Sequence, residues 1–123
     1  MNKPMAAAVL VALCSVAHAS WASDANNGFL TGKFFKGGSP SLRTAYVIGV
    51  LDGFSYAPAF GAPDAKISKL QRCIGAMHAD ASQVGTIVDR YLDAHPESLN
   101  DKMQPIVLRA MRQACAGNGT SIE

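Results

Sequence analysis

Two stripes of apolar side chains near the end of the chain constrain its fold most. In the first, one helical face carries side chains at positions i, i+3, i+4, i+7, i+8 and i+11, namely Val84, Ile87, Val88, Tyr91, Leu92 and His95. The second repeats this spacing with Met103, Ile106, Val107, Ala110, Met111 and Ala114. Each stripe is typical of an amphipathic helix. Because Pro96 ends the first run, we expect the two helices to form an antiparallel hairpin.

Residues at the ends of these stripes are typical helix caps. Asp80, with Gln83 three residues later, forms an N-terminal capping pattern for the first helix. Asp101 and Gln104 are predicted to cap the second helix, and Gly117 is predicted to end it. The expected solvent side of the second helix carries Arg109, Arg112 and Gln113.

Residues 41–56 form the most apolar segment ahead of the hairpin. Its apolar side chains surround almost the whole circumference of a helix: Leu42, Ala45, Tyr46, Val47, Ile48, Val50, Leu51 and Phe54. A helix that is apolar all round is normally buried, so we expect this one at the centre, with the hairpin closing over it. Gly49 and Gly53, four residues apart, would let a neighbour approach one face closely. A strand over residues 45–51 stays open as an alternative, because valine and isoleucine favour strands.

Shorter segments complete the predicted domain. Residues 27–36 carry apolar side chains at helical spacing and are expected to form a short helix, which the sequence Gly-Gly-Ser-Pro of residues 37–40 would end. Residues 57–65 contain two prolines and a glycine and are predicted to be a loop. We expect one or two helical turns over residues 66–72 and a break over residues 75–80.

The start of the chain has the pattern of a signal peptide. Lys3 precedes an apolar run over residues 5–17, and Ala17-His18-Ala19 is a cleavage signal that would release the chain at Ser20. The alternative is a transmembrane anchor, but a bilayer needs about 20 apolar residues and this run is shorter. We therefore expect export with cleavage, and no membrane contact afterwards.

Loss of the signal peptide leaves an even number of cysteines. Cys14 departs with the apolar run, whereas Cys73 and Cys115 remain. In an oxidising compartment such a pair is expected to form a disulfide. Closing the long loop between them would stabilise the fold by about 4 kcal/mol in the chain-entropy model. The alternative of free thiols or metal ligands lacks support, because the sequence has no Cys-x-x-Cys and His78 and His95 stand alone.

These features predict an all-α fold, a small bundle of four to five helices closed by one disulfide. The helical domain is expected over residues 39–123, behind the signal peptide over residues 1–19. A leader and short N-terminal helix would occupy residues 20–38. A mature chain of this length suffices for one such domain and is too short for two.

Catalytic and cofactor-binding patterns are not found in the sequence. The serines lack a G-x-S-x-G context, and Gly37-Gly38 lacks the lysine and hydroxyl residue of a phosphate-binding loop. A net charge of +2, with no basic run, gives no sign of a nucleic-acid partner. We therefore expect neither an enzyme nor a cofactor-binding protein.

Three isolated polar residues have structural explanations. His95 lies at the end of a helix, where a core or capping role is expected, and His78 lies in a loop, where it would be solvated. Asp52 interrupts an apolar run, and burying it unpaired would be costly. It is therefore expected either to face water or a partner, or to accept hydrogen bonds from a neighbouring loop.

Two sequence motifs resemble those of one protein family. Residues 45–53, Ala-Tyr-Val-Ile-Gly-Val-Leu-Asp-Gly, form the first motif. Residues 91–97, Tyr-Leu-Asp-Ala-His-Pro-Glu, followed by a helix ending in Cys115, form the second. They resemble the type VI secretion immunity proteins that neutralise peptidoglycan-amidase effectors, the Rap/Tai immunity family. The residues that carry the resemblance are Tyr46, Gly49, Asp52, Gly53, Tyr91, Leu92, His95 and Pro96.

The resemblance implies a small, all-helical periplasmic protein, often a homodimer, that binds a cell-wall amidase and obstructs its active-site cleft. Two features depart from the family pattern. Residues 74–78, Ile-Gly-Ala-Met-His, replace a stretch that usually bears a proline, which affects the geometry of the expected binding loop. Family members also commonly carry further cysteines upstream, so this chain would be a single-bridge variant.

Two loops are the candidate contacts for such a partner, over residues 57–65 and 74–80. Exposed aromatic and methionine side chains suit interface anchors, so we expect contact through Tyr56, Phe60, Met77 and His78. A plainer alternative is that Tyr56 and Phe60 cover the core. The second functional hypothesis is a periplasmic acid-stress chaperone, another class of small helical protein with one disulfide.

Overall fold

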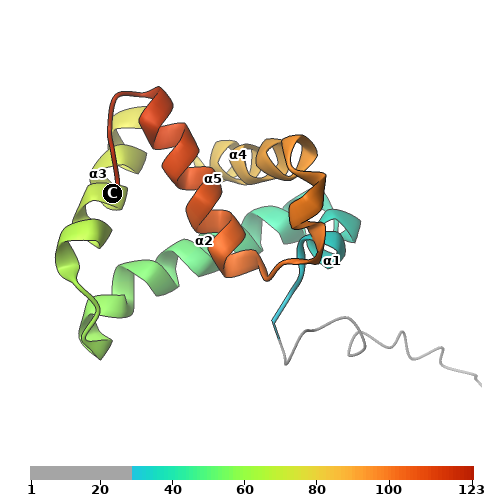
Figure 1. Cartoon of the computed structure of the whole chain (residues 1–123), viewed down its shortest axis with the longest axis horizontal. Helices are drawn as coiled ribbons and strands as arrows, with labels where there is room; N and C mark the ends of the chain where they lie inside the picture. Colours follow the sequence, from blue (N-terminus) through green and yellow to red (C-terminus); the bar gives the residue numbers. More distant parts are fainter. Residues whose placement is uncertain (1–28) are drawn as a thin grey trace, which may run out of the picture.

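The computed structural model describes residues 29–123, and this part of the chain folds into helices without a strand (Figure 1). The elements are α1 (Gly32–Gly37), α2 (Pro40–Tyr56), the 3-10 helix η1 (Ala57–Phe60), α3 (Asp64–Met77), α4 (Ala81–Ala94), the 3-10 helix η2 (Pro96–Asn100) and α5 (Met103–Gly117). The predicted all-α class is therefore confirmed. Within residues 29–123, no helix has the length and apolar character needed to cross a membrane. The predicted signal peptide, Cys14 and most of the expected leader lie outside the described residues.

The predicted hairpin is formed by α4 and α5, with η2 between them. Their largest buried side chains are Val84, Val88, Leu92, Met103, Ile106, Val107 and Met111. The expected capping pattern of α4 is present, since the backbone N–H of Gln83 donates to Asp80 Oδ1 (2.9 Å) and that of Asp80 donates to Gln83 Oε1 (2.8 Å). The predicted cap of α5 is wrong. Lys102 is the N-cap, and its ammonium cannot accept a bond from a backbone N–H. The Asp101 carboxylate accepts from Arg109 (2.7 Å).

The segment that was expected at the centre forms α2, so the alternative of a strand is wrong. Its first turn is capped by the Ser39 hydroxyl. The expected central burial is also wrong, because α2 packs against the other helices by one side and buries only Val47 and Leu51. The neighbour that comes closest is α4, where a Cβ added at Gly85 would lie 2.8 Å from Thr44 Oγ1.

The third helix is longer than the sequence indicated. α3 begins at Asp64, so the expected loop over residues 57–65 holds η1 and the start of α3. It continues through Gly75, and the expected break begins only at His78. A glycine inside a helix costs about 1 kcal/mol relative to alanine, and the disulfide at Cys73, two residues before Gly75, ties this part of α3 to α5.

The short first helix is held to α4 by ion pairs. α1 begins at Gly32, later than expected, because the Thr31 hydroxyl caps it there. The Lys36 ammonium contacts the carboxylates of Asp89 (3.1 Å) and Asp93 (2.7 Å) on α4. These carboxylates, Asp93 most of all, raise the pKa of Lys36. The predicted end of this helix at the two glycines is confirmed.

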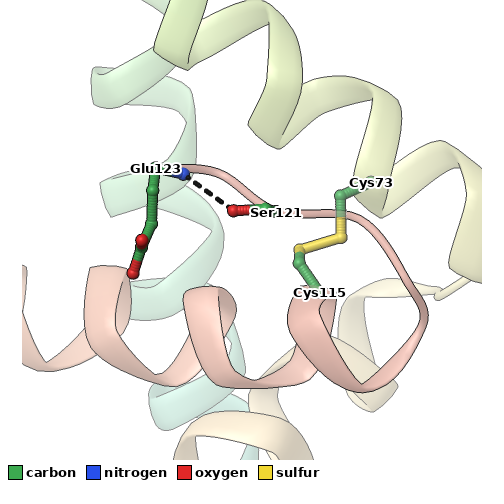
Figure 2. Close-up of a disulfide and its surroundings, with 4 residues drawn as sticks. All are labelled: Cys73, Cys115, Ser121 and Glu123. Carbon is green, nitrogen blue, oxygen red and sulfur yellow. Dashed lines mark hydrogen bonds between the residues drawn. A yellow bond between two sulfur atoms is a disulfide. The ribbon is translucent and has the colours of Figure 1, made fainter.

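The predicted disulfide joins α3 to α5 (Figure 2). The Cα atoms of Cys73 and Cys115 are 5.8 Å apart, within the usual range for a disulfide, and both cysteines are buried in the core. After α5 the chain turns back past the bridge, as the positions of Ser121 and Glu123 in Figure 2 show. This tail buries Ile122 against the core.

Candidate interaction surface

Two aromatic side chains project from the corner where α2 gives way to α3. Tyr56, the last residue of α2, is 66% exposed, and Phe60, the last residue of η1, is 84% exposed. Their rings contact each other edge to face, with centroids 5.7 Å apart. The pair therefore does not cover the core of its own chain, and it forms an apolar projection open to a partner.

Hydrogen bonds fix the backbone beneath this aromatic pair. Pro58 restricts the first turn of η1, and Gly61 takes a left-handed conformation (φ 86°) that turns the chain toward α3. The N–H of Gly61 donates to the Pro58 carbonyl (3.0 Å), and that of Ala62 donates to the Ala57 carbonyl (3.3 Å). Because this turn is already ordered, a partner would meet the two rings in a position that needs little further ordering.

An open helical face continues from the aromatic pair along α2. We call it the outer face of α2; it consists of the exposed residues Leu42, Ala45, Gly49, Gly53 and Tyr56, spaced three or four apart. No atom lies within 4 Å of a Cβ added at Gly49 or Gly53. The close approach that the sequence predicted at these glycines is thus not made within the described chain, and the face is free for another molecule. Leu42, 45% exposed at the far end, is a candidate contact that the sequence analysis did not single out.

Beside the outer face, α2 and α5 enclose a shallow apolar hollow. Its walls include Tyr46, Val50 and Phe54 of α2 and Gln104 of α5. The Tyr46 hydroxyl is shielded from solvent and has no hydrogen-bond partner among residues 29–123, and burial raises the pKa of this group. Its ring packs edge to face on Phe35 (6.1 Å), so this motif residue holds α1 against α2.

Asp52 lies on the exposed side of α2 and makes no hydrogen bond or ion pair within the described residues. Of the two expectations for this carboxylate, the structure therefore fits the one in which it faces water or a partner. It borders the outer face next to Gly49 and Gly53, so a partner seated on that face would also meet one negative charge.

Met77 and His78 lie apart from the aromatic pair. Met77 is half-buried against the core at the end of α3, and exposed His78 ends that helix in the left-handed region (φ 49°). The 14 residues of α3 separate them from η1, a rise of about 20 Å along the helix. The four predicted contact residues therefore form two separate candidate sites, and the aromatic pair offers more exposed apolar surface.

The second family-like motif shapes the turn of the hairpin. Leu92 is buried, and the Tyr91 ring stacks on that of His95 (4.3 Å). His95 ends α4, and its Nδ1 lies 3.0 Å from the Glu97 carboxylate. The pKa of Glu97 is lowered, first by its own backbone N–H and then by His95. Pro96 starts η2, so these residues fix where the chain turns toward α5.

The titratable side chains of this surface form no cluster suited to metal binding. Across residues 29–123, no group of three or more His, Cys, Asp and Glu side chains could hold a metal ion. What the surface does offer is exposed apolar area on an ordered backbone.

Comparison with protein-family models, curated proteins and solved structures finds no match to this chain. The two sequence motifs resemble those of one family, and that resemblance therefore rests on the sequence alone. They lie in different settings, the first on the largely exposed α2 and the second at the junction of α4 and η2.

Proposed function

We propose that this chain is a periplasmic immunity protein that binds a peptidoglycan-amidase effector of type VI secretion and blocks its active-site cleft. The observation that carries the proposal is the exposed aromatic pair, Tyr56 and Phe60, on a corner with a fixed backbone. We place this pair at the centre of the contact.

A projecting aromatic pair is suited to filling a cleft. Large aromatic side chains at the centre of an interface commonly supply most of its binding energy. The two rings here already contact each other, so binding would order few additional torsions. The outer face of α2 continues the apolar surface, and its glycines would let the wall of an amidase cleft approach the helix backbone.

The predicted route of export fits this role. An amidase that cuts peptidoglycan acts in the periplasm, so its inhibitor has to reach the same compartment. The signal-peptide pattern predicts that route, and the Cys73–Cys115 disulfide is of a kind that persists in oxidising compartments. The resemblance of two motifs to amidase-immunity proteins directs the proposal to this class of partner.

The test is production of the matching amidase in the periplasm, with and without this chain. We expect the chain to prevent lysis and to form a complex with the amidase on gel filtration. The double variant Tyr56→Ala/Phe60→Ala should lose both properties while keeping its helical circular dichroism. Phe29→Ala, a matched control at an exposed aromatic residue outside the corner, should keep both.

Two results would contradict the proposal. One is unchanged lysis in the presence of the chain, with no complex detected. The other is full protection by the Tyr56→Ala/Phe60→Ala variant, which would place the contact elsewhere. The double variant Met77→Ala/His78→Ala then tests the second candidate site, at the far end of α3.

The chaperone hypothesis leads to a different expectation. An acid-stress chaperone exposes its apolar surface when acidified, whereas Tyr56 and Phe60 are exposed in the folded chain already. Suppression of the aggregation of unrelated proteins at low pH, together with no binding to the amidase, would favour the chaperone.

A further inference from the structure

A second candidate site lies under the C-terminal tail, between α3 and α5. It is a hollow of about 170 Å³ with mainly apolar walls. The walls that matter here are Ile67 and Leu70 of α3, Leu108 of α5 and Ile122 of the tail. Two cationic side chains, Lys66 and Arg112, also line it, together with Phe54, Ala62 and Pro63.

These two cations lack anionic partners. Neither Lys66 nor Arg112 forms an ion pair or hydrogen bond within residues 29–123. The Arg112 Nε is also shielded from solvent, so it has lost its water without gaining an acceptor. By contrast Arg109, one turn earlier on the same helix, pairs with Asp101. Arg112, which was expected on the solvent side of its helix, is thus half-buried.

A desolvated donor without an acceptor is unfavourable. An anion seated in the hollow would provide that acceptor to Arg112, and its charge would be matched by Lys66 as well. Because the remaining walls are apolar, the rest of such a ligand should be aliphatic. The lining thus combines recognition of a negative head group with burial of a hydrocarbon chain.

The surrounding structure keeps this hollow in shape. The disulfide ties α3 to α5 at Cys73 and Cys115, and Lys66 and Leu108 each lie seven residues before the bridged cysteine of their own helix. The tail covers one side, where Ile122 is 3% exposed and the Lys69 ammonium donates to the Glu123 carbonyl (2.9 Å). A site held by a covalent bridge and a bound tail needs little rearrangement to accept a ligand.

We propose that this hollow binds a short-chain aliphatic carboxylate, with the carboxylate on Arg112 and Lys66 and the hydrocarbon chain among Ile67, Leu70 and Leu108. The volume is below the roughly 300–1,000 Å³ of pockets that hold drug-sized ligands, so one short chain is the appropriate size. Neither Tyr56 nor Phe60 lines the hollow, and its test requires no amidase.

The test is isothermal titration calorimetry of the mature, disulfide-bonded chain with hexanoate, hexanol and acetate. We expect saturable binding of one hexanoate, and binding at least about tenfold weaker for hexanol, which lacks the charge, and for acetate, which lacks the chain. Arg112→Met should weaken hexanoate binding at least about tenfold and leave hexanol binding unchanged. Arg109→Met, the matched control on the same helix, should bind hexanoate like the unmodified chain.

Two further variants keep the proposal testable should Arg112→Met fail to fold. Lys66→Met should weaken hexanoate binding in the same direction. Ile122→Ala should enlarge the hollow, so the preferred ligand should shift from hexanoate to octanoate. Equal affinity for hexanol and hexanoate, unchanged hexanoate binding in folded Arg112→Met or Lys66→Met, or the absence of saturable binding would each overturn the proposal.

Discussion

Replacing Gly85 with alanine places a methyl group in the tightest contact between α2 and α4. A Cβ built at this glycine lies 2.8 Å from Thr44 Oγ1 and 3.4 Å from the Thr44 Cα atom. A separation of 2.8 Å is too short for a carbon–oxygen contact, so the helices would have to move apart or the threonine would have to turn. Gly49, in the middle of α2, provides the comparison, because no atom lies within 4 Å of its added Cβ.

Two opposing contributions to the free energy of unfolding determine the effect of each substitution. Glycine to alanine in a helix interior is favourable by about 1 kcal/mol. Overpacking a filled contact costs about 1–3 kcal/mol, and this cost applies only to Gly85. We therefore expect Gly49→Ala to raise the free energy of unfolding by about 1 kcal/mol and Gly85→Ala to leave it unchanged or lower it by up to about 2 kcal/mol.

The assay is thermal unfolding followed by circular dichroism, with urea unfolding as a second measure of stability. For a domain of this size 1 kcal/mol corresponds to a shift of about 4–8 °C in Tm, so the two variants should differ by at least about 4 °C. Thr44→Ala combined with Gly85→Ala removes the Oγ1 atom and should recover most of the loss.

Equal stabilisation by Gly85→Ala and Gly49→Ala would refute the packing of α2 on α4 described above. Destabilisation by Gly49→Ala would show instead that the outer face of α2 is covered by another molecule under the conditions of the assay.

Three further predictions concern the bridge and the charges. Replacing Cys73 and Cys115 together with alanine should lower the free energy of unfolding by about 4 kcal/mol, as measured by urea unfolding, and no change would mean that the bridge is absent. The pKa of Asp80 is lowered, chiefly by the Gln83 N–H, so its stabilising effect is present above its ordinary pKa of 3.8 and is lost as the pH falls through the lower native value. Asp80→Ala should therefore lower Tm at pH 6, with the difference from the unmodified chain vanishing in acid; a constant difference would contradict this. The pKa of Lys36 is raised, so its effect is present below pH 10.5 and is lost as the pH rises through the higher native value. Lys36→Met should lower Tm at pH 7. The decrease should be smaller in 1 M salt, where the screening length falls to about 3 Å. A decrease that changes neither with salt nor at high pH would show that the ion pairs do not contribute to stability.

The hairpin could be predicted from the sequence because a helical stripe marks both the element and its buried face. Val88 and Val107, for example, lie in the stripes and are fully buried. The disulfide could also be predicted, because two cysteines remain once the signal peptide is removed. The cap of α5 could not be predicted, because whether Asp101 bonds the backbone or Arg109 depends on a side-chain conformation that spacing does not specify.

The position of α2 could not be predicted for a related reason. Apolar residues all round a helix do not indicate which side packs, and here α4 covers only the side of Val47 and Leu51. The chain therefore exposes Leu42 and Tyr56, which the same pattern would bury in a larger protein.

The aromatic corner, meaning the exposed pair Tyr56 and Phe60 after α2, could be predicted in part from the sequence. The hollow between α3 and α5 could not. Tyr56 and Phe60 could be named from residue type, but residue type does not indicate how exposed η1 and the turn at Gly61 leave them. Arg112 resembled an ordinary solvent-facing arginine, since its spacing along α5 gives no sign that its Nε is shielded from solvent beside the hollow.

Hydrogen-exchange mass spectrometry of the mature chain, alone and with the amidase, tests most directly whether the aromatic corner is the binding site. Binding through Tyr56 and Phe60 should slow backbone exchange over residues 54–62 and leave exchange around His78 unchanged. Unaltered exchange over residues 54–62 in the complex, or protection confined to other segments, would contradict the proposed contact.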